Sequence, residues 1–290
     1  MNKLGLGTAQ FGSNYGIANS FGKIKLFEAK NIFKLAEESN ISLIDTAIDY
    51  GDSEKIIGDI GIKRLKVVTK LPDLPKNFSD IDYWVQDRVK TSLKNLGIET
   101  LYGLLLHRPE NLLGNSGEKL VKALYQIKSC GLVKKIGISI YDPKELDQVT
   151  NLIKLDIIQA PLNIIDRRLE KSGWLSKLNQ LGVEVHTRST FLQGLLLMPR
   201  RKIPSKFDQW ADIWNKWHLE LSKNNLNAVE ECLLYPMSLS EVNCVIVGVD
   251  NLKHLKNLIE ISKNNKPSKD WSFMISNDPM LINPTNWKKF

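Results

Sequence analysis

The 290-residue sequence predicts an α/β protein that folds as a single-domain (β/α)8 barrel of the TIM type. Short β-branched or apolar segments alternate with longer helical patterns about eight times, which is typical of parallel α/β architecture. Most of the short segments are nearly continuous apolar runs, as expected of parallel strands covered on both faces. No linker, low-complexity tract or repeat interrupts this alternation, and eight units favour a closed barrel over an open, doubly wound sheet.

The predicted strands are eight short segments spread along the chain. In chain order they are Lys3–Thr8, Ser42–Asp45, Leu65–Lys70, Thr100–His107, Lys135–Ser139, Ile157–Ala160, Val183–Thr187 and Val242–Val247. In a barrel of this kind, reactive residues lie at the carboxyl ends of the strands and in the loops that follow them. The residues at the ends of these segments are therefore the first candidates for chemistry.

Three helices between these strands have clear sequence signals. Leu26–Glu38 repeats apolar residues at the spacing of one helix face. Ser79–Leu96 has the same periodicity and is followed by Gly97, a residue type that commonly ends a helix. Asp142 begins the segment Asp-Pro-Lys-Glu, which supplies an N-cap, a proline at the first helical position and a glutamate three residues later.

Charge and composition argue against several classes of protein. The net charge is +8, but 40 basic residues interleave with 32 acidic ones, which is typical of solvated helix faces rather than of a nucleic-acid surface. The first residues lack the apolar run of a secretory signal, and no segment has the apolar length of a membrane span. Cys130, Cys232 and Cys244 lie far apart and have no metal-ligand spacing. We expect a cytoplasmic protein, a monomer or weak homo-oligomer, that binds neither metal, nucleic acid nor membrane.

Four ionisable residues fall at the ends of consecutive predicted strands. Asp45 ends the second strand, Tyr50 follows in the next loop, Lys70 ends the third strand and His107 ends the fourth. Each residue alone has a structural explanation, such as a loop cap, a loop aromatic, a solvated amine or a buried histidine. Because the ends of neighbouring parallel strands converge, the joint pattern predicts one catalytic cleft.

The four side chains together would make a tuned proton donor. A tyrosine has an ordinary pKa near 10, which is high for acid catalysis at neutral pH. We expect the Lys70 ammonium to lower the pKa of Tyr50, and Asp45 to keep Lys70 charged and in place. His107 beside the phenol could orient a carbonyl oxygen or help to pass the proton.

These residues, in this order, resemble the aldo-keto reductase superfamily, whose fold is the α/β barrel. The opening Gly5–Gly12 resembles the first strand and loop of that family, and Ile44–Gly51 resembles its Asp-Tyr signature. Val68–Lys70 and Leu106–Pro109 resemble its lysine and histidine strands, so the likeness extends over nearly the whole chain. The resemblance implies reduction of an aldehyde or ketone by NADPH, with NADH possible. Residues 12–19 and 188–197 resemble a bacterial branch associated with sugar or surface-polysaccharide metabolism, which implies a sugar-like small-molecule carbonyl substrate.

The resemblance also implies which residues bind the nicotinamide. Ser139 and Gln159 resemble the serine and glutamine that contact the carboxamide. Arg188 stands in place of the residue that stacks on the nicotinamide ring, commonly a tyrosine, and a guanidinium can stack on a planar ring. Ile140 stands where the family usually has an asparagine, which removes one carboxamide contact.

The remaining cofactor positions implied by the resemblance lie at the first, seventh and eighth strands. They are Gly7 and Thr8 in the first strand, Ser189 through Gly194 beside the pyrophosphate, and Gly248, Asp250 and Asn251 beside the adenosine. Many NADPH-preferring members carry basic residues where this chain has Gly248 and His254, and Lys253 and His254 could substitute in part. The preference for NADPH therefore rests on family habit.

Several functions and local interpretations remain open at this point. Besides a carbonyl reductase, the chain could be a cofactor-binding regulator with negligible turnover, or an unrelated barrel enzyme in which Lys70 forms a Schiff base. Arg108 could contact substrate or form a rim ion pair. Trp210, Trp214 and Trp217 recur at helical spacing and predict a packed face rather than a substrate cage. The C-terminal tail, residues 264–290, could cover the substrate pocket or pack on the barrel exterior.

Overall fold

The computed structural model describes residues 3–62, 64–75, 78, 80–264 and 269–289. Eight parallel strands close into a barrel in chain order, and the last strand pairs with the first. The strands are β1 Leu4–Gly7, β2 Leu43–Asp45, β3 Lys66–Leu71, β4 Leu101–Leu106, β5 Val133–Ser139, β6 Ile157–Pro161, β7 Glu184–Arg188 and β8 Cys244–Gly248. Each begins and ends within two residues of its predicted bounds, so the (β/α)8 barrel is confirmed.

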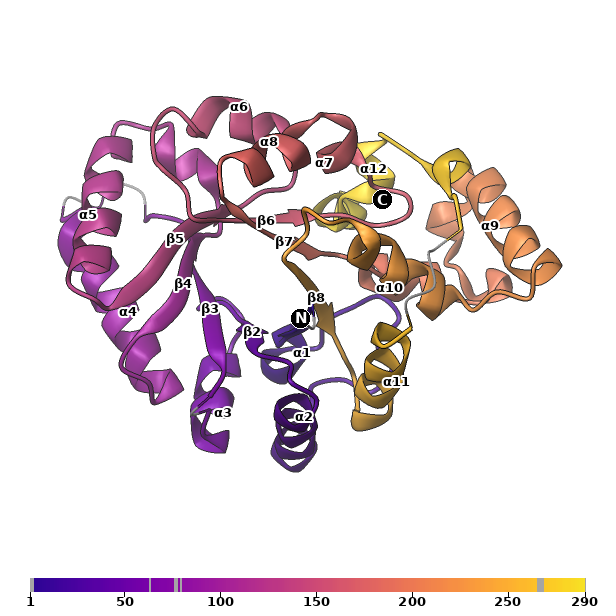
Figure 1. Cartoon of the computed structure of the whole chain (residues 1–290), viewed down its shortest axis with the longest axis horizontal. Helices are drawn as coiled ribbons and strands as arrows, with labels where there is room; N and C mark the ends of the chain where they lie inside the picture. Colours follow the sequence, from indigo (N-terminus) through magenta and orange to yellow (C-terminus); the bar gives the residue numbers. More distant parts are fainter. Residues whose placement is uncertain (1–2, 63, 76–77, 79, 265–268, 290) are drawn as a thin grey trace.

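Helices surround the barrel and cover the outer faces of the strands (Figure 1). The α-helices are α1 Ala9–Gly12, α2 Leu26–Glu38, α3 Ser53–Ile60, α4 Ile81–Leu96, α5 Gly117–Ser129, α6 Lys144–Val149, α7 Arg168–Lys171, α8 Trp174–Gln180, α9 Ala211–Lys223, α10 Ala228–Ser238, α11 Leu252–Ser262 and α12 Pro279–Ile282. The 3-10 helices are η1 Pro109–Leu112, η2 Leu192–Leu197, η3 Arg200–Lys202, η4 Ser205–Trp210, η5 Ser272–Met274 and η6 Pro284–Lys289. None of the helices in the described ranges is long and apolar enough to cross a membrane.

Two of the three predicted helix signals act as expected, and the third is shifted by one residue, because α6 begins at Lys144 with Pro143, and not Asp142, at its N-cap. Helix α2 has the predicted bounds, and α4 ends at Gly97, whose φ of 65° lies in the left-handed region. The predicted start of α4, Ser79, lies outside the described residues. Before α6, the Asp142 carboxylate accepts the Lys144 N–H, and Glu145 accepts the Asp142 N–H. These reciprocal bonds satisfy amide groups that the helix leaves unpaired.

The barrel interior is filled by side chains. Leu43, Val68, Leu105, Ile157 and Cys244 form an apolar cluster inside the strands, apart from the larger core between strands and helices. A methyl group added at Gly103 would lie 2.7 Å from the Ile157 side chain, so a larger residue there would force the interior apart. Because this interior is packed, a ligand must bind at one end of the barrel.

The described part of the C-terminal tail, residues 269–289, packs on α9 and η4 and reaches the loop after β6, where the Ser276 N–H donates to the Ile165 carbonyl oxygen. The Trp271 ring lies 4.6 Å from the ring of Trp217 in α9, and the Trp287 ring lies 4.9 Å from Phe207 in η4. In Figure 1 the yellow tail accordingly lies beside the orange α9. Trp214 and Trp217 are fully buried, so the predicted packed face is confirmed. Residues 265–268 and 290 of the predicted tail lie outside the described residues.

Candidate active site

A buried ion pair lies at the carboxyl end of the barrel. Lys70 of β3 donates hydrogen bonds of 2.8 and 2.7 Å to the two carboxylate oxygens of Asp45 of β2. Its third donor reaches the Thr46 carbonyl oxygen at 2.8 Å. Burial lowers the pKa of Lys70, and the charge of Asp45 opposes that effect. All three ammonium donors are therefore occupied by the protein itself.

Tyr50 is held beside this pair by a tight loop. Its carbonyl carbon and oxygen lie against Gly12 so closely that a side chain at Gly12 would overlap them, and Gly51 follows in the left-handed region with a φ of 55°. The Lys70 Nζ lies 5.2 Å from the centroid of the Tyr50 ring. No hydrogen bond to the Tyr50 hydroxyl is present among the described residues. The phenol is thus close to the ammonium without receiving a bond from it.

The expected lowering of the pKa of Tyr50 is wrong for this structure. Burial raises the pKa of Tyr50 above its ordinary value of 10, and the negative charge of Asp45 raises it further. The main cause is the removal of the phenol from water, and the Lys70 ammonium, which is bonded to both Asp45 oxygens and lies 5.2 Å from the ring centroid, does not outweigh it. Tyr50 therefore holds its proton at neutral pH.

His107 completes the cluster directly after β4. Its ring meets the Tyr50 ring edge-on, with centroids 6.0 Å apart, and its Nδ1 lies 3.7 Å from an Asp49 carboxylate oxygen. Burial lowers the pKa of His107 to about 3, helped by the positive charges of Lys70, Arg188 and Arg108. The imidazole is neutral at physiological pH, with one nitrogen able to donate and the other to accept. All four residues predicted at the strand ends are thus neighbours.

Gln159 of β6 extends this polar cluster. Its amide nitrogen donates to Asp45 Oδ1 at 2.6 Å, while its carbonyl oxygen is buried and has no partner in the described part of the chain. Ser139 ends β5, is also buried, and pairs in register with Gln159. A buried acceptor without a donor is costly, and such groups occur where a ligand completes the bond. These two predicted cofactor residues therefore fit a carboxamide group.

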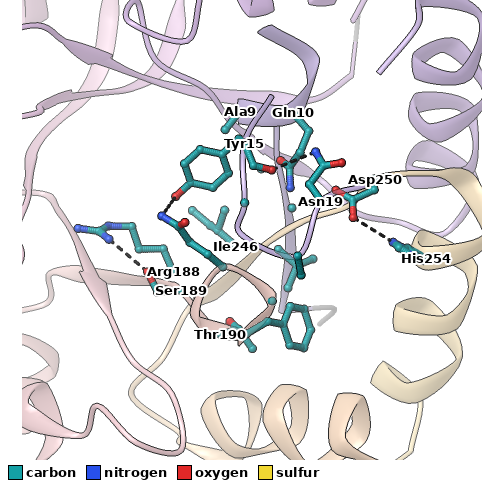
Figure 2. A pocket seen from close by; sticks show the side chains of 18 of the residues that line it. Ala9, Gln10, Tyr15, Asn19, Arg188, Ser189, Thr190, Ile246, Asp250 and His254 are labelled. Carbon is teal, nitrogen blue, oxygen red and sulfur yellow. Dashed lines mark hydrogen bonds and ion pairs between the residues drawn. The ribbon is translucent and has the colours of Figure 1, made fainter. Parts of the chain in front are cut away.

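Arg188 lies differently from the expectation. Its guanidinium stacks on Tyr141, 4.3 Å from the ring centroid, and donates to the Ile140 carbonyl oxygen at 2.9 Å. Ile140 itself is fully buried in the core. In Figure 2 the Arg188 side chain extends away from Ile246, which lies near the middle of the view. The structure therefore supplies an aromatic partner for Arg188 within the chain, and stacking on a nicotinamide stays a prediction.

A cavity of about 460 Å³ opens beside Tyr50 (Figure 2). The predicted residues that line it are Gly7, Thr8, Asp45, Tyr50, Arg188, Ser189, Gly194, Gly248 and Asp250. Its size and mixed lining are those of a small-molecule or cofactor pocket. Lys70, His107, Ser139 and Gln159 are not part of this lining, and Asn251 instead caps α11 by accepting the His254 N–H.

Other lining residues were missed by sequence reasoning. Asn19 and Phe21 come from the segment between α1 and α2, whose Ala18 N–H reaches the Gln193 carbonyl oxygen at 3.4 Å. Gln10 comes from α1, directly after the predicted β1 residues. The position of Gln10 after a strand end could have indicated it. For Asn19 and Phe21 no local signal exists, because the contact joins segments about 170 residues apart.

The segment after β7 is strained where it borders the cavity. Ser189, Leu192, Gln193 and Gly194 all have positive φ, between 47° and 87°. Non-glycine residues in this region cost about 1–3 kcal/mol each, and such outliers cluster at ligand sites. Thr190 Oγ1 is buried there without a partner among the described residues. Successive left-handed residues can turn backbone N–H groups toward an anion, which fits the pyrophosphate assignment.

Comparisons with known proteins agree with this geometry. The sequence profile of the "Aldo/keto reductase family" matches residues 3–276. The oxidoreductase sirO of Leptosphaeria maculans is 27% identical over 214 residues, 70% of this chain and 64% of the relative. The NADH-specific methylglyoxal reductase of Escherichia coli is 29% identical over 185 residues, 56% of either chain. The chain thus matches less than two thirds of the length of either relative.

Solved structures show the same fold. The holo form of the aldo-keto reductase AKR11C1 from Bacillus halodurans superposes with a TM-score of 0.73, at 20% identity, over 94% of this chain and 90% of that one. The glycerol dehydrogenase AKR11B4 from Gluconobacter oxydans superposes with a TM-score of 0.70, at 20% identity, over 97% and 92%. At such low sequence identity, these structural similarities establish the barrel fold only. The chemistry has to be argued from the residues of the site.

Proposed function

Because this chain belongs to the aldo/keto reductase family, we propose that it reduces an aldehyde or ketone with a nicotinamide cofactor and that Tyr50 is the general acid. The observation that carries the proposal is a protonated phenol, free of hydrogen bonds to the described protein, between a buried Asp45–Lys70 pair and a neutral His107. This group lines the cavity in which a cofactor and a carbonyl compound would meet.

The residues divide the work of a carbonyl reduction. A reduced nicotinamide, when bound in the cavity, would supply a hydride to the carbonyl carbon. Tyr50 transfers its hydroxyl proton to the carbonyl oxygen, which becomes the alcohol, and is left as a phenolate. Lys70, held by Asp45, stabilises that phenolate through its charge at 5.2 Å from the ring. Neutral His107 donates a hydrogen bond to the carbonyl oxygen and orients it.

We also propose how the dinucleotide lies in the cavity. The unpaired Gln159 oxygen accepts from the carboxamide at the nicotinamide end. The strained segment from Ser189 to Gly194 receives the pyrophosphate, and the turn from Gly248 to Asp250 borders the adenosine. The relative named as NADH-specific supports NADH as a possible cofactor. Its name and that of the glycerol dehydrogenase favour a small, polar substrate, in agreement with the sugar-like carbonyl expected from sequence.

Two other functions were compatible with the sequence. The Schiff-base hypothesis requires a free, neutral amine, whereas Lys70 is buried and bonded by all three donors to Asp45 and Thr46. The structure therefore argues against it. A cofactor-binding regulator would use the cavity without needing the protonated Tyr50, so measurement of turnover separates it from an enzyme.

The test has two stages on the full chain. Fluorescence titration with NADH and with NADPH should give saturable binding of at least one of them. Oxidation of the bound dinucleotide should then depend on an added carbonyl compound in a panel of small aldehydes, ketones and open-chain sugars. Absence of binding would refute the proposal. Tight binding with no turnover across the panel would refute the catalytic part and support the regulator.

A further inference from the structure

The two ends of the cavity carry different charges. Figure 2 shows Tyr15 and Arg188 on one side, and Asp250 and His254 on the opposite side. Tyr50 belongs to the first side, because it lies close enough to Arg188 and Tyr141 for both groups to influence the pKa of its hydroxyl. At the other side the lining comes from the end of β8, from α11 and from Gln10. If the nicotinamide lies beside Tyr50, as the proposed function requires, the adenosine ribose lies at the Asp250 end.

Asp250 is the acidic group of that end. Burial raises the pKa of Asp250, while the charge of His254 and a hydrogen bond from Gln10 oppose this. One Asp250 carboxylate oxygen lies 3.7 Å from His254 Nδ1, and the Phe21 ring meets the His254 ring edge-on, 6.2 Å away. The carboxylate is thus held at the cavity wall by Gln10 of α1 and His254 of α11, and Phe21 packs on His254.

Within the described residues, no lysine or arginine balances this carboxylate in the cavity. Among the described lining residues, Arg188 is the one side chain of either type, and it belongs to the opposite side. Lys253 and Lys256 are exposed on α11 and do not line the cavity. His254 does line it, but it already faces Asp250. A phosphate on the adenosine ribose would meet Asp250 first and would have to compete with it for His254.

We propose that Asp250 makes this protein select NADH over NADPH. The carboxylate accepts a hydrogen bond from a ribose hydroxyl of NADH and repels the 2′-phosphate of NADPH. The same physical logic places an acidic residue on the ribose hydroxyl in other NAD sites and an arginine on the 2′-phosphate in NADP sites. The inference rests on the proposed function for the orientation of the dinucleotide. It reverses the expectation of NADPH, which rested on family habit.

The experiment measures dissociation constants of NADH and NADPH by calorimetry, without turnover. Wild-type protein should bind NADH at least about tenfold more tightly, because a carboxylate and a phosphate a few ångströms apart repel strongly even at an effective dielectric constant of about 20. Asp250→Asn keeps the shape and the Gln10 contact and should reduce the ratio by tightening NADPH. Asp250→Lys should reverse the ratio. Asp82→Asn, an identical change at an exposed site on α4, should leave it unchanged.

Ionic strength supplies a second readout. Raising the salt concentration from about 0.05 M to about 0.5 M should reduce the preference of wild-type protein for NADH over NADPH, because salt screens the repulsion between Asp250 and the 2′-phosphate. The same change in salt should have little effect on this preference in Asp250→Asn. Wild-type protein that binds NADPH as tightly as NADH, or an unchanged ratio in both Asp250 variants, would overturn the inference and leave the reductase proposal standing. Binding of neither dinucleotide would overturn both.

Discussion

The two ends of the barrel each hold a tyrosine beside an ion pair, which is half-buried at the amino end and buried at the carboxyl end, and the two tyrosines are bonded differently. At the amino end, Tyr102 donates its hydroxyl to Glu184 at 2.7 Å, and Lys135 reaches the same oxygen at 2.5 Å. The ammonium groups of Lys66 and Lys135 lie 4.7 and 5.0 Å from the Tyr102 ring. Burial opposes ionisation of Glu184, but hydrogen bonds from His186, Lys135 and Tyr102 bring its pKa down to about 2.

At the carboxyl end the hydroxyl of Tyr50 has no hydrogen-bond partner in the part of the chain that the structure describes. Tyr50 keeps a raised pKa, Gln159 Oε1 has no donor among the described residues, and the segment from Ser189 to Gly194 is strained. At the amino end, Lys135 and Tyr102 both donate to Glu184, and these bonds stabilise the barrel. At the carboxyl end the same residue types remain incomplete, which costs stability and leaves groups available to a ligand. The difference separates a structural cluster from a reactive one.

The largest expected effect comes from removing one oxygen at each end. Tyr50→Phe should lower kcat by about 10²–10⁴-fold, because the proton donor is lost, with little change in cofactor affinity or stability. Tyr102→Phe should keep kcat and cost about 1–2 kcal/mol of unfolding free energy, because Glu184 loses a donor. Steady-state kinetics and urea denaturation of both variants measure this contrast. Normal turnover in Tyr50→Phe would end the assignment of the acid.

Breaking the buried pair should have the next largest effect. Lys70→Met leaves the Asp45 carboxylate buried and unpaired and should cost about 3–5 kcal/mol of stability. The double variant with Asp45→Asn should regain much of that stability but no turnover, because the charge that stabilises the Tyr50 phenolate is absent. If Lys70→Met keeps some activity, the unpaired Asp45 charge should raise the pKa of Tyr50. The pH–activity profile of the variant should then move to higher pH. Equal stability losses in the single and double variants would show that packing, and not charge, is responsible.

The smallest expected effects appear in the pH dependence of stability. His107 has a pKa of about 3 when folded and 6.5 as the ordinary value, so between these values the unfolded chain binds a proton that the folded chain does not. The stability that depends on neutral His107 is therefore complete above pH 6.5 and is lost as the pH falls from 6.5 toward 3. Glu184, with a folded pKa of about 2 against 4.5, contributes stability that is lost only between pH 4.5 and 2.

Two substitutions separate these windows. His107→Asn should reduce the slope of the urea midpoint against pH between pH 6.5 and 4.5. Glu184→Gln should leave that slope unchanged and reduce the slope below pH 4.5, where His107 also titrates. A midpoint that falls with identical slope in wild-type protein and His107→Asn between pH 6.5 and 4.5 would show that His107 titrates normally in the folded state.

The sequence by itself determined the barrel and the positions of its reactive residues. Strand identity follows from continuous apolar runs, and a residue such as Lys70 or His107 at the end of a run must lie at the carboxyl end of the barrel, since parallel strands all point that way. Helix ends followed in the same way from local signals, as at Gly97. These features depend on a few adjacent residues and were therefore predictable.

Only the tertiary structure decided the electrostatic environment and the side-chain direction of those residues. The sign of the shift in the pKa of Tyr50 depends on the bidentate contact between Asp45 and Lys70, and the direction of Arg188 depends on Tyr141, which lies on another loop. The carboxylate of Asp250 became informative once it was found beside His254, on which Phe21 packs. Electrostatic effects add up over every group within several ångströms, and these groups come from segments far apart in the chain, so no local pattern could predict their balance.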